Sequence, residues 1–328
     1  MPKNIYISGI SDFFTKTIET SFYVRNIAEK QTSESKKRYL EVLLQDSTGT
    51  IFGTIWEEYM EAEYESYVGK VVQINGMVVQ NQDASYQLII THMALLDEYL
   101  YSDYVNGISE KDTKSYLELL HKYIGAVKSQ NYRNLLHHIF TSIPDFEILP
   151  ATLKGHHNFN GGLLVYSVSV TCLAKYMAYS LEKYNLNPSY SLPYNSDLVI
   201  AGGLLHAIGT VNMLKPFPEM KRIPESIPSN LHELTIQYLC RMLSQNNGFN
   251  LTEEEESLLM HTIGCVYEST DRKPMIREAI ILKNAIQLQG DVSRLEYFLF
   301  SNQDKCGSVF DPALNNYIYI QKEHTDNG

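Results

Sequence analysis

The sequence of 328 residues is short of cysteine, of positive charge and of long apolar runs, and each shortage argues against a class of protein. Its four cysteines lie far apart without a CxxC pair, which disfavours a disulfide framework or a zinc site and predicts reduced, mostly buried thiols. No run of about 18 apolar residues is present that could span a membrane as a helix. The first residues, MPKNIYISGISDFF, lack the basic and then apolar layout of a signal peptide. These features predict a cytoplasmic protein without a membrane partner. The cysteines are Cys172, Cys240, Cys265 and Cys306.

The shortage of cations argues against a broad basic surface for nucleic acid. The chain has 27 Lys and Arg against 38 Asp and Glu, a formal net charge of −11. Residues 1–105 alone hold 8 cationic and 15 acidic side chains. Any contact with nucleic acid is therefore expected to be local, or weak and sensitive to salt. The 24 tyrosines argue in the other direction, in favour of nucleic-acid binding, because aromatic rings can stack on bases without positive charge.

Two kinds of periodicity divide the chain. Residues 1 to about 100 alternate like strands, as in RYLEVLLQDSTGTIFGTIW with its DSTG turn, VGKVVQINGMVVQ and YQLIITHMALL. Five short strands and an acidic helical insert near EEYMEAEYESYV predict a small β-barrel. From Ser109 onward apolar residues recur at helical spacing. Helices are predicted over Gly161–Tyr184, Asp197–Gly209, Leu231–Ser244, Glu253–Tyr267 and Pro274–Gln289, with irregular loops over 186–197 and 215–229.

Three segments carry a family resemblance. They are LLQDSTGTIFGTIW in the strand region, then PATLKGHHNFNGGLLVYSVSV and DLVIAGGLLHAIGTV in the helical region. Together and in this order they resemble the YhaM-type 3′–5′ exoribonucleases, which join an OB-fold to a helical HD domain. The resemblance implies a multidomain β + α chain: an OB-fold β-barrel of the nucleic-acid-binding type over 1–105, a helical linker over 106–150, an all-α HD-domain-like region over 151–300 and a C-terminal tail over 301–328.

The resemblance also locates a metal site and shows that its ligands are missing. In the family, histidines and aspartates from several helices hold divalent metals, which activate a water molecule for attack on a phosphodiester. Only His206 keeps a ligand type here, with Glu233, next to His232, as an acidic substitute for another ligand. The resemblance thus implies a degenerate site, no metal cofactor and no catalytic residue. The degenerate positions are Tyr166, His206, Ala207, Glu233, Val266, Tyr267 and Ile286, with Gln289 at a further acidic position.

Each of these residues also has a purely structural interpretation. His206 fits a histidine at the edge of the core whose ring is hydrogen-bonded. His156 and His157, which match the family, form with His206 a possible residual site for a ligand or phosphate, or else pack at the start of a helix. The acidic run Glu253–Glu256 fits the first turn of a helix, where carboxylates favour the positive end of the dipole.

The strand region offers the candidate nucleic-acid-binding residues. Lys36, Lys37 and Arg38 form one basic run in a loop between strands, and OB-folds bind single strands on a sheet face and through such loops. The structural alternative is a solvated loop with core aromatics, and Trp56, the only tryptophan, is expected to be buried. The candidate stacking residues are Tyr39, Tyr86, Trp56 and Tyr59.

Three functions follow from the sequence. The first is an inactive homologue of a metal-dependent 3′–5′ exoribonuclease that binds single-stranded RNA or DNA, or a partner protein. The second is an active exonuclease with displaced ligands, which alone would require Mn or Mg. The third is a protein-interaction module without nucleic-acid binding.

Overall fold

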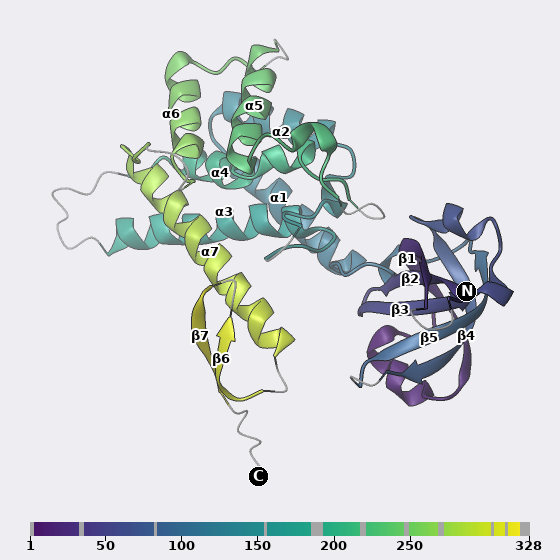
Figure 1. Ribbon diagram of the computed structural model, residues 1–328. Coiled ribbons are helices and arrows are strands. Elements are labelled where there is room, and N and C mark those ends of the chain that lie inside the picture. Colours follow the sequence, from purple (N-terminus) through teal and green to yellow (C-terminus); the bar gives the residue numbers. More distant parts are fainter. Residues whose placement is uncertain are drawn as a thin grey trace. The chain divides into compact units, whose positions relative to one another are not determined.

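The computed structural model describes residues 3–32, 36–81, 84–153, 156–184, 193–216, 221–245, 249–267, 272–302, 305–311 and 314–321. The chain forms two compact units (Figure 1). The first comprises residues 1–110 with 216–220, and the second comprises 111–215 with 221–328. Among the described residues, no helix combines the length and apolar character needed to cross a membrane.

The first unit is a closed barrel of five strands. These are β1 (Thr17–Gln31), β2 (Arg38–Asp46), β3 (Gly49–Trp56), β4 (Val71–Gln80) and β5 (Tyr86–Leu95), in the order β1-β2-β3-β5-β4. The pair β3 and β5 is parallel, and the other pairs are antiparallel. A five-stranded barrel with this crossover has the architecture of an OB-fold, so the predicted N-terminal barrel is confirmed.

Strand alternation builds the barrel core. Leu40, Val42 and Leu44 of β2 are buried and face inward, together with Ile51 and Ile55 of β3. The acidic insert forms two 3₁₀ turns, η2 (Glu57–Tyr59) and η3 (Tyr64–Tyr67), where the sequence predicted a longer helix. Tyr64 and Tyr67 of η3 are buried in the barrel core.

A buried ion pair ties the N-terminal segment to the barrel. The Nζ atom of Lys3 lies 3.5 Å from the carboxylate of Asp46, and both side chains are fully buried. Asp46 also accepts hydrogen bonds from the backbone N–H groups of Ile7 (2.8 Å) and Thr48 (2.9 Å). Burial lowers the pKa of Lys3 to about 8, and the neighbouring Asp46 opposes that shift. The pair therefore depends on both charges being retained.

The second unit is mainly helical and has one large core. Its core includes residues of the region predicted as a helical linker, such as Leu120 and Leu135, so those helices pack with the rest. Helix α3 lies against α4 and α7 at the centre of the unit (Figure 1). The α-helices are α1 (Glu110–Ala126), α2 (Gln130–Ser142), α3 (Gly162–Lys183), α4 (Ser196–Leu205), α5 (Leu231–Ser244), α6 (Glu253–Gly264) and α7 (Arg277–Ser301). The other 3₁₀ helices among the described residues are η1 (Ile7–Phe13), η4 (Tyr101–Asp103), η5 (Phe146–Ile148), η7 (Ile208–Asn212) and η8 (Pro224–Ser226).

The region predicted as a C-terminal tail contains regular secondary structure. It contains a hairpin of β6 (Gly307–Asp311) and β7 (Asn316–Ile320). Helix α7 also continues past the predicted end at Gln289, because Gly290 is buried inside the helix instead of terminating it. Of the predicted irregular loops 186–197 and 215–229, residues 186–192 and 217–220 lie outside the described residues.

The expectation of mostly buried thiols was wrong. Cys172, Cys240 and Cys306 are exposed, and only Cys265 is buried. Cys172 on α3 and Cys240 on α5 occupy outward positions of helices whose other faces form the core. Burial is thus decided by the face of the helix and not by the residue type.

Candidate functional site

Three of the positions that the family resemblance predicted to be degenerate meet in the core of the helical unit. His206 follows the last residue of α4, is completely buried, and its Nδ1 atom lies 2.8 Å from the carbonyl oxygen of Gly203. The ring of Tyr166 on α3 meets the His206 ring edge-on, with centroids 4.6 Å apart. The hydroxyl of Tyr267 donates a hydrogen bond of 2.6 Å to the backbone oxygen of His206. The Nε2 atom of His206 has no partner among the described residues.

His156 and His157 join this cluster from the segment before α3. Their Nδ1 atoms lie 3.0 Å apart, and their rings lie 5.1 and 4.9 Å from that of Tyr166. The backbone conformation after the two histidines requires glycine at positions 161 and 162. Gly161 has a φ of 83°, and a Cβ atom on Gly162 would lie 2.1 Å from the carbonyl oxygen of His157. The structure therefore places all three predicted residual-site histidines around one tyrosine.

The other degenerate positions do not add ligands to this cluster. Ala207 is buried and apolar, and Val266 and Ile286 pack in the core. The carboxylate of Glu233 is exposed and accepts from the backbone N–H of Asn230 in a capping box (3.0 Å) at the start of α5. His232 stacks on Tyr267 with centroids 5.0 Å apart. On α7, the side-chain amide of Gln289 lies 3.3 Å from Ser293.

Burial keeps the cluster uncharged near neutral pH. Desolvation lowers the pKa of His157 to about 4 and that of His206 to about 4, and it also lowers the pKa of His156. Desolvation raises the pKa of Tyr166 to about 12 and raises that of Tyr267 as well. The cluster thus contains neutral imidazoles and protonated phenols.

This donor set does not fit the divalent metal that the family resemblance implies. Hard cations such as Mn²⁺ and Mg²⁺ favour carboxylate and other oxygen ligands, and phenols with raised pKa values remain protonated. The described residues contain no group of three or more His, Cys, Asp or Glu side chains arranged to hold an ion. No metal-dependent hydrolytic step follows from this centre.

The outward face of β2 and β3 carries aromatic and apolar side chains, of which Phe52 is exposed and Tyr39, Leu43 and Trp56 are half-buried. Tyr39 lies opposite Trp56, and Leu43 lies opposite Phe52 in the strand register. The rings of Tyr39 and Trp56 are 5.5 Å apart, and Phe52 is 51% exposed. Trp56, which was expected to be buried, is half-buried, because alternation along β3 sends Ile55 inward and Trp56 outward. We call these four residues the aromatic face.

The cations beside the aromatic face differ in their availability. The guanidinium of Arg38 lies 2.5 Å from Glu29 and 4.0 Å from Glu57, so two carboxylates already engage it. Lys36 and Lys37 are exposed, and in the described part of the chain neither side chain has an ion pair. Of the other stacking candidates, Tyr86 packs against the barrel core and contacts Phe14 (centroids 6.2 Å apart), and Tyr59 is 42% exposed in η2.

The sequence-based candidates omitted Leu43 and Phe52. The sequence does contain the pattern that would have indicated them. The DSTG turn fixes the register of β2 and β3, and the alternation of side chains along the strands then puts both residues on the outward face. What sequence alone could not give was the distinction between Arg38 and the two lysines, because Glu29 comes from another strand.

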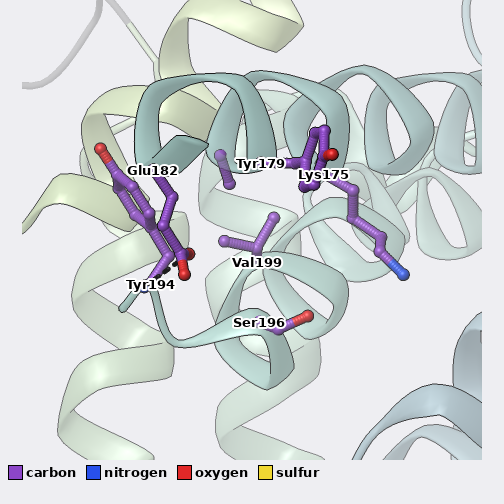
Figure 2. A pocket seen from close by; sticks show the side chains of 7 residues that line it. Lys175, Tyr179, Glu182, Tyr194, Ser196 and Val199 are labelled. Atoms are coloured by element: carbon purple, nitrogen blue, oxygen red, sulfur yellow. Dashed lines mark hydrogen bonds between the residues drawn. The ribbon is translucent and has the colours of Figure 1, made fainter. Parts of the chain in front are cut away.

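A cavity of about 250 Å³ lies in the helical unit between the C-terminal half of α3 and the start of α4. Figure 2 shows Tyr194 and Glu182 on one side of it and Tyr179 on the other, with Val199 between them. The backbone N–H of Tyr194 lies 3.5 Å from a carboxylate oxygen of Glu182. No sequence motif pointed to this cavity. Its lining residues are Lys175, Ala178, Tyr179, Glu182, Tyr194, Ser196 and Val199.

Comparison with known proteins gives no family assignment, since no family model matches the chain. Among similar solved structures is the second OB-fold domain of replication protein A from Methanococcus maripaludis, with 22% identity and a TM-score of 0.20, covering 27% of this chain and 89% of that one. Asparaginyl-tRNA synthetase from Pyrococcus horikoshii, complexed with asparaginyl-adenylate, is 10% identical with a TM-score of 0.23. That match covers 48% of this chain and 39% of the synthetase chain. At these scores the description of the barrel rests on its own strand order.

Proposed function

We propose that the barrel binds single-stranded nucleic acid on the aromatic face, and that the helical unit is related to HD domains but has no hydrolytic activity. The observation that carries the proposal is the outward-facing, half-buried aromatic pair of Tyr39 and Trp56, together with the exposed ring of Phe52, on β2 and β3. This sheet face is the usual ligand surface of OB-folds, and stacking contributes about 1–3 kcal/mol per base.

The distribution of charged side chains on the barrel favours binding of a strand through few phosphate contacts. Lys36 and Lys37 stand at the edge of β2 and are available to phosphates, whereas Arg38 is held by Glu29. The acidic balance of the barrel opposes a strand with many phosphate contacts. The proposal therefore predicts modest affinity, dominated by stacking and with a shallow dependence on salt.

The decisive variant is Trp56→Ala, with Met77→Ala as its control. Removing one stacking ring should weaken binding of a thymine-rich single strand about tenfold, measured by fluorescence anisotropy. Met77 on β4 is 40% exposed and outside the aromatic face, so its loss should leave affinity unchanged. Equal affinity of the Trp56→Ala variant and the parent chain would refute the proposal and favour a protein partner on this face.

The salt dependence tests the cations separately. The double change Lys36→Ala with Lys37→Ala should reduce the slope of log K against log salt by about 1.4, which is about 0.7 for each phosphate contact. Arg38→Ala should leave the slope nearly unchanged, because its guanidinium is already paired with Glu29. A larger effect of Arg38→Ala than of the double change would contradict this assignment.

A further inference from the structure

We propose that the cavity between α3 and α4 binds a nucleobase, with guanine preferred, presented by a free nucleotide or by a single strand. The cavity belongs to the helical unit, and the inference does not rest on the function proposed for the barrel. Its volume of about 250 Å³ is slightly below the range of pockets for drug-sized ligands, about 300–1,000 Å³. It therefore suits one compact ring system.

The walls favour a planar ring. Two tyrosines, Tyr179 on α3 and Tyr194 before α4, line the cavity from different sides, and Ala178 and Val199 give it an apolar floor (Figure 2). Tyr179 is 57% exposed, so much of its ring is available to a ligand. Tyrosine rings around a small apolar floor are a stacking environment for a base.

The cations already placed on these rings argue against a cationic ligand. The guanidinium of Arg277 lies 4.4 Å from the centroid of Tyr194, and Nζ of Lys183 lies 5.4 Å from that of Tyr179. Each cation uses the negative potential of its tyrosine ring. A cationic ligand between the two tyrosines would be repelled by Arg277 and by Lys183, whereas an uncharged aromatic ligand would stack on the rings without this repulsion.

Polar groups at the edge select the base. Glu182 is exposed at the cavity, and its carboxylate only accepts hydrogen bonds. The edge of guanine presents two adjacent N–H donors, N1–H and the N2 amino group, which match the two oxygens of a carboxylate. Lys175 also lines the cavity, and its ammonium lies 5.0 Å from the centroid of the Tyr123 ring on α1. That ammonium can meet a phosphate attached to the base.

The test uses the full chain and isothermal titration with guanosine monophosphate, adenosine monophosphate and inorganic phosphate. We expect saturable binding of the guanine nucleotide, weaker binding of the adenine nucleotide and none of phosphate alone. Tyr179→Ala should weaken binding of guanosine monophosphate about tenfold, and Glu182→Gln should remove the preference for guanine. Tyr176→Ala is the matched control, because Tyr176 is 68% exposed on the same helix and does not line the cavity.

A second arm distinguishes a free nucleotide from a strand and separates the cavity from the barrel. A short thymine oligonucleotide with one guanine is titrated into the Trp56→Ala chain, with and without Tyr179→Ala. Binding of the oligonucleotide that depends on Tyr179, without binding of the mononucleotide, would assign the site to a strand. Binding of both ligands would assign it to a base from either source. The proposal is overturned if neither ligand binds the Trp56→Ala chain, or if Tyr176→Ala and Tyr179→Ala weaken binding equally.

Discussion

His157 and His206 are buried histidines with few polar partners, and they should make the helical unit sensitive to acid. Their folded pKa values of about 4 lie below the ordinary value of 6.5. The unfolded state therefore binds more protons between these limits, so the stability of the fold is fully present above pH 6.5 and is lost as the pH falls towards 4. For the fully buried His206, the loss at pH 5 is about 2 kcal/mol. Urea unfolding followed by circular dichroism at 222 nm, at pH 7.5 and pH 5, measures it.

His206→Phe is the informative variant for this effect. Phenylalanine keeps the ring contact with Tyr166 and removes both the titrating group and the unpartnered Nε2 atom. The variant should lose less stability between pH 7.5 and pH 5 than the parent chain. His137→Ala serves as the control, since His137 is exposed on α2. If His206→Phe and the parent chain lose the same stability, the titrating groups lie elsewhere.

For single residues of the candidate site, the sequence predicted the identity of the residue but not its contacts. The family resemblance singled out His156, His157, Tyr166 and His206, but their ring contacts depend on how α3 packs against α4 and on the left-handed backbone of Gly161. Glu233 could not be distinguished from a ligand until its role as a helix cap was visible. In physical terms, a sequence motif indicates which residues are candidates for a site, whereas the packing of the helices decides which of these residues are in contact.

Among the elements, the segment GGLLHAIGTV shows that its glycines serve packing. The sequence predicted Gly209 as the residue that ends a helix, but α4 ends at Leu205 and Gly209 lies inside η7. A Cβ atom on Gly209 would lie 2.3 Å from the backbone nitrogen of Thr235 on α5. This glycine is therefore required for the close approach of η7 to α5.

Gly209→Ala should accordingly destabilise the helical unit by about 3 kcal/mol or more, because backbone atoms cannot move aside as a side chain can. Gly125→Ala is the control: Gly125 is exposed in α1, and a methyl group added there would meet open space. That change should stabilise the chain by about 0.5–1 kcal/mol, as expected for glycine in a helix. Thermal unfolding of the two variants checks both signs, and a neutral Gly209→Ala would show that η7 and α5 can separate.

The elements differ in how well sequence predicted them, for identifiable reasons. Helix α5 was predicted from Leu231 to Ser244 and has those bounds, because its apolar residues recur at helical spacing. The acidic residues Glu253–Glu256 form the first turn of α6, as predicted. Helix α7 was predicted too short, since Gly290 resembles a helix end but packs near His156. The hairpin of β6 and β7 was missed because its strands are short.

At the scale of the whole molecule, the two largest hydrophobic cores of the described residues lie in different units, and a small third cluster around Tyr104 lies in the barrel unit. One core fills the barrel, and a second, larger core joins α1 to α7. The only tryptophan, Trp56, lies in the barrel, whereas nearly all helical signal comes from the other unit. Tryptophan fluorescence and circular dichroism at 222 nm therefore report on different cores.

Two variants should each shift the unfolding transition of one unit and leave that of the other unit unchanged. Asp46→Asn leaves the charge of Lys3 buried without its partner, which costs about 3–5 kcal/mol, so the fluorescence transition of the barrel should shift to lower urea. The exposed pair of Lys30 and Glu41 supplies the control, because Glu41→Gln should cost less than about 1 kcal/mol. Gly209→Ala should instead shift the dichroism transition and leave the fluorescence transition in place. Two independent cores require this crossed pattern; a single variant that moves both transitions equally would show that the units unfold as one cooperative structure.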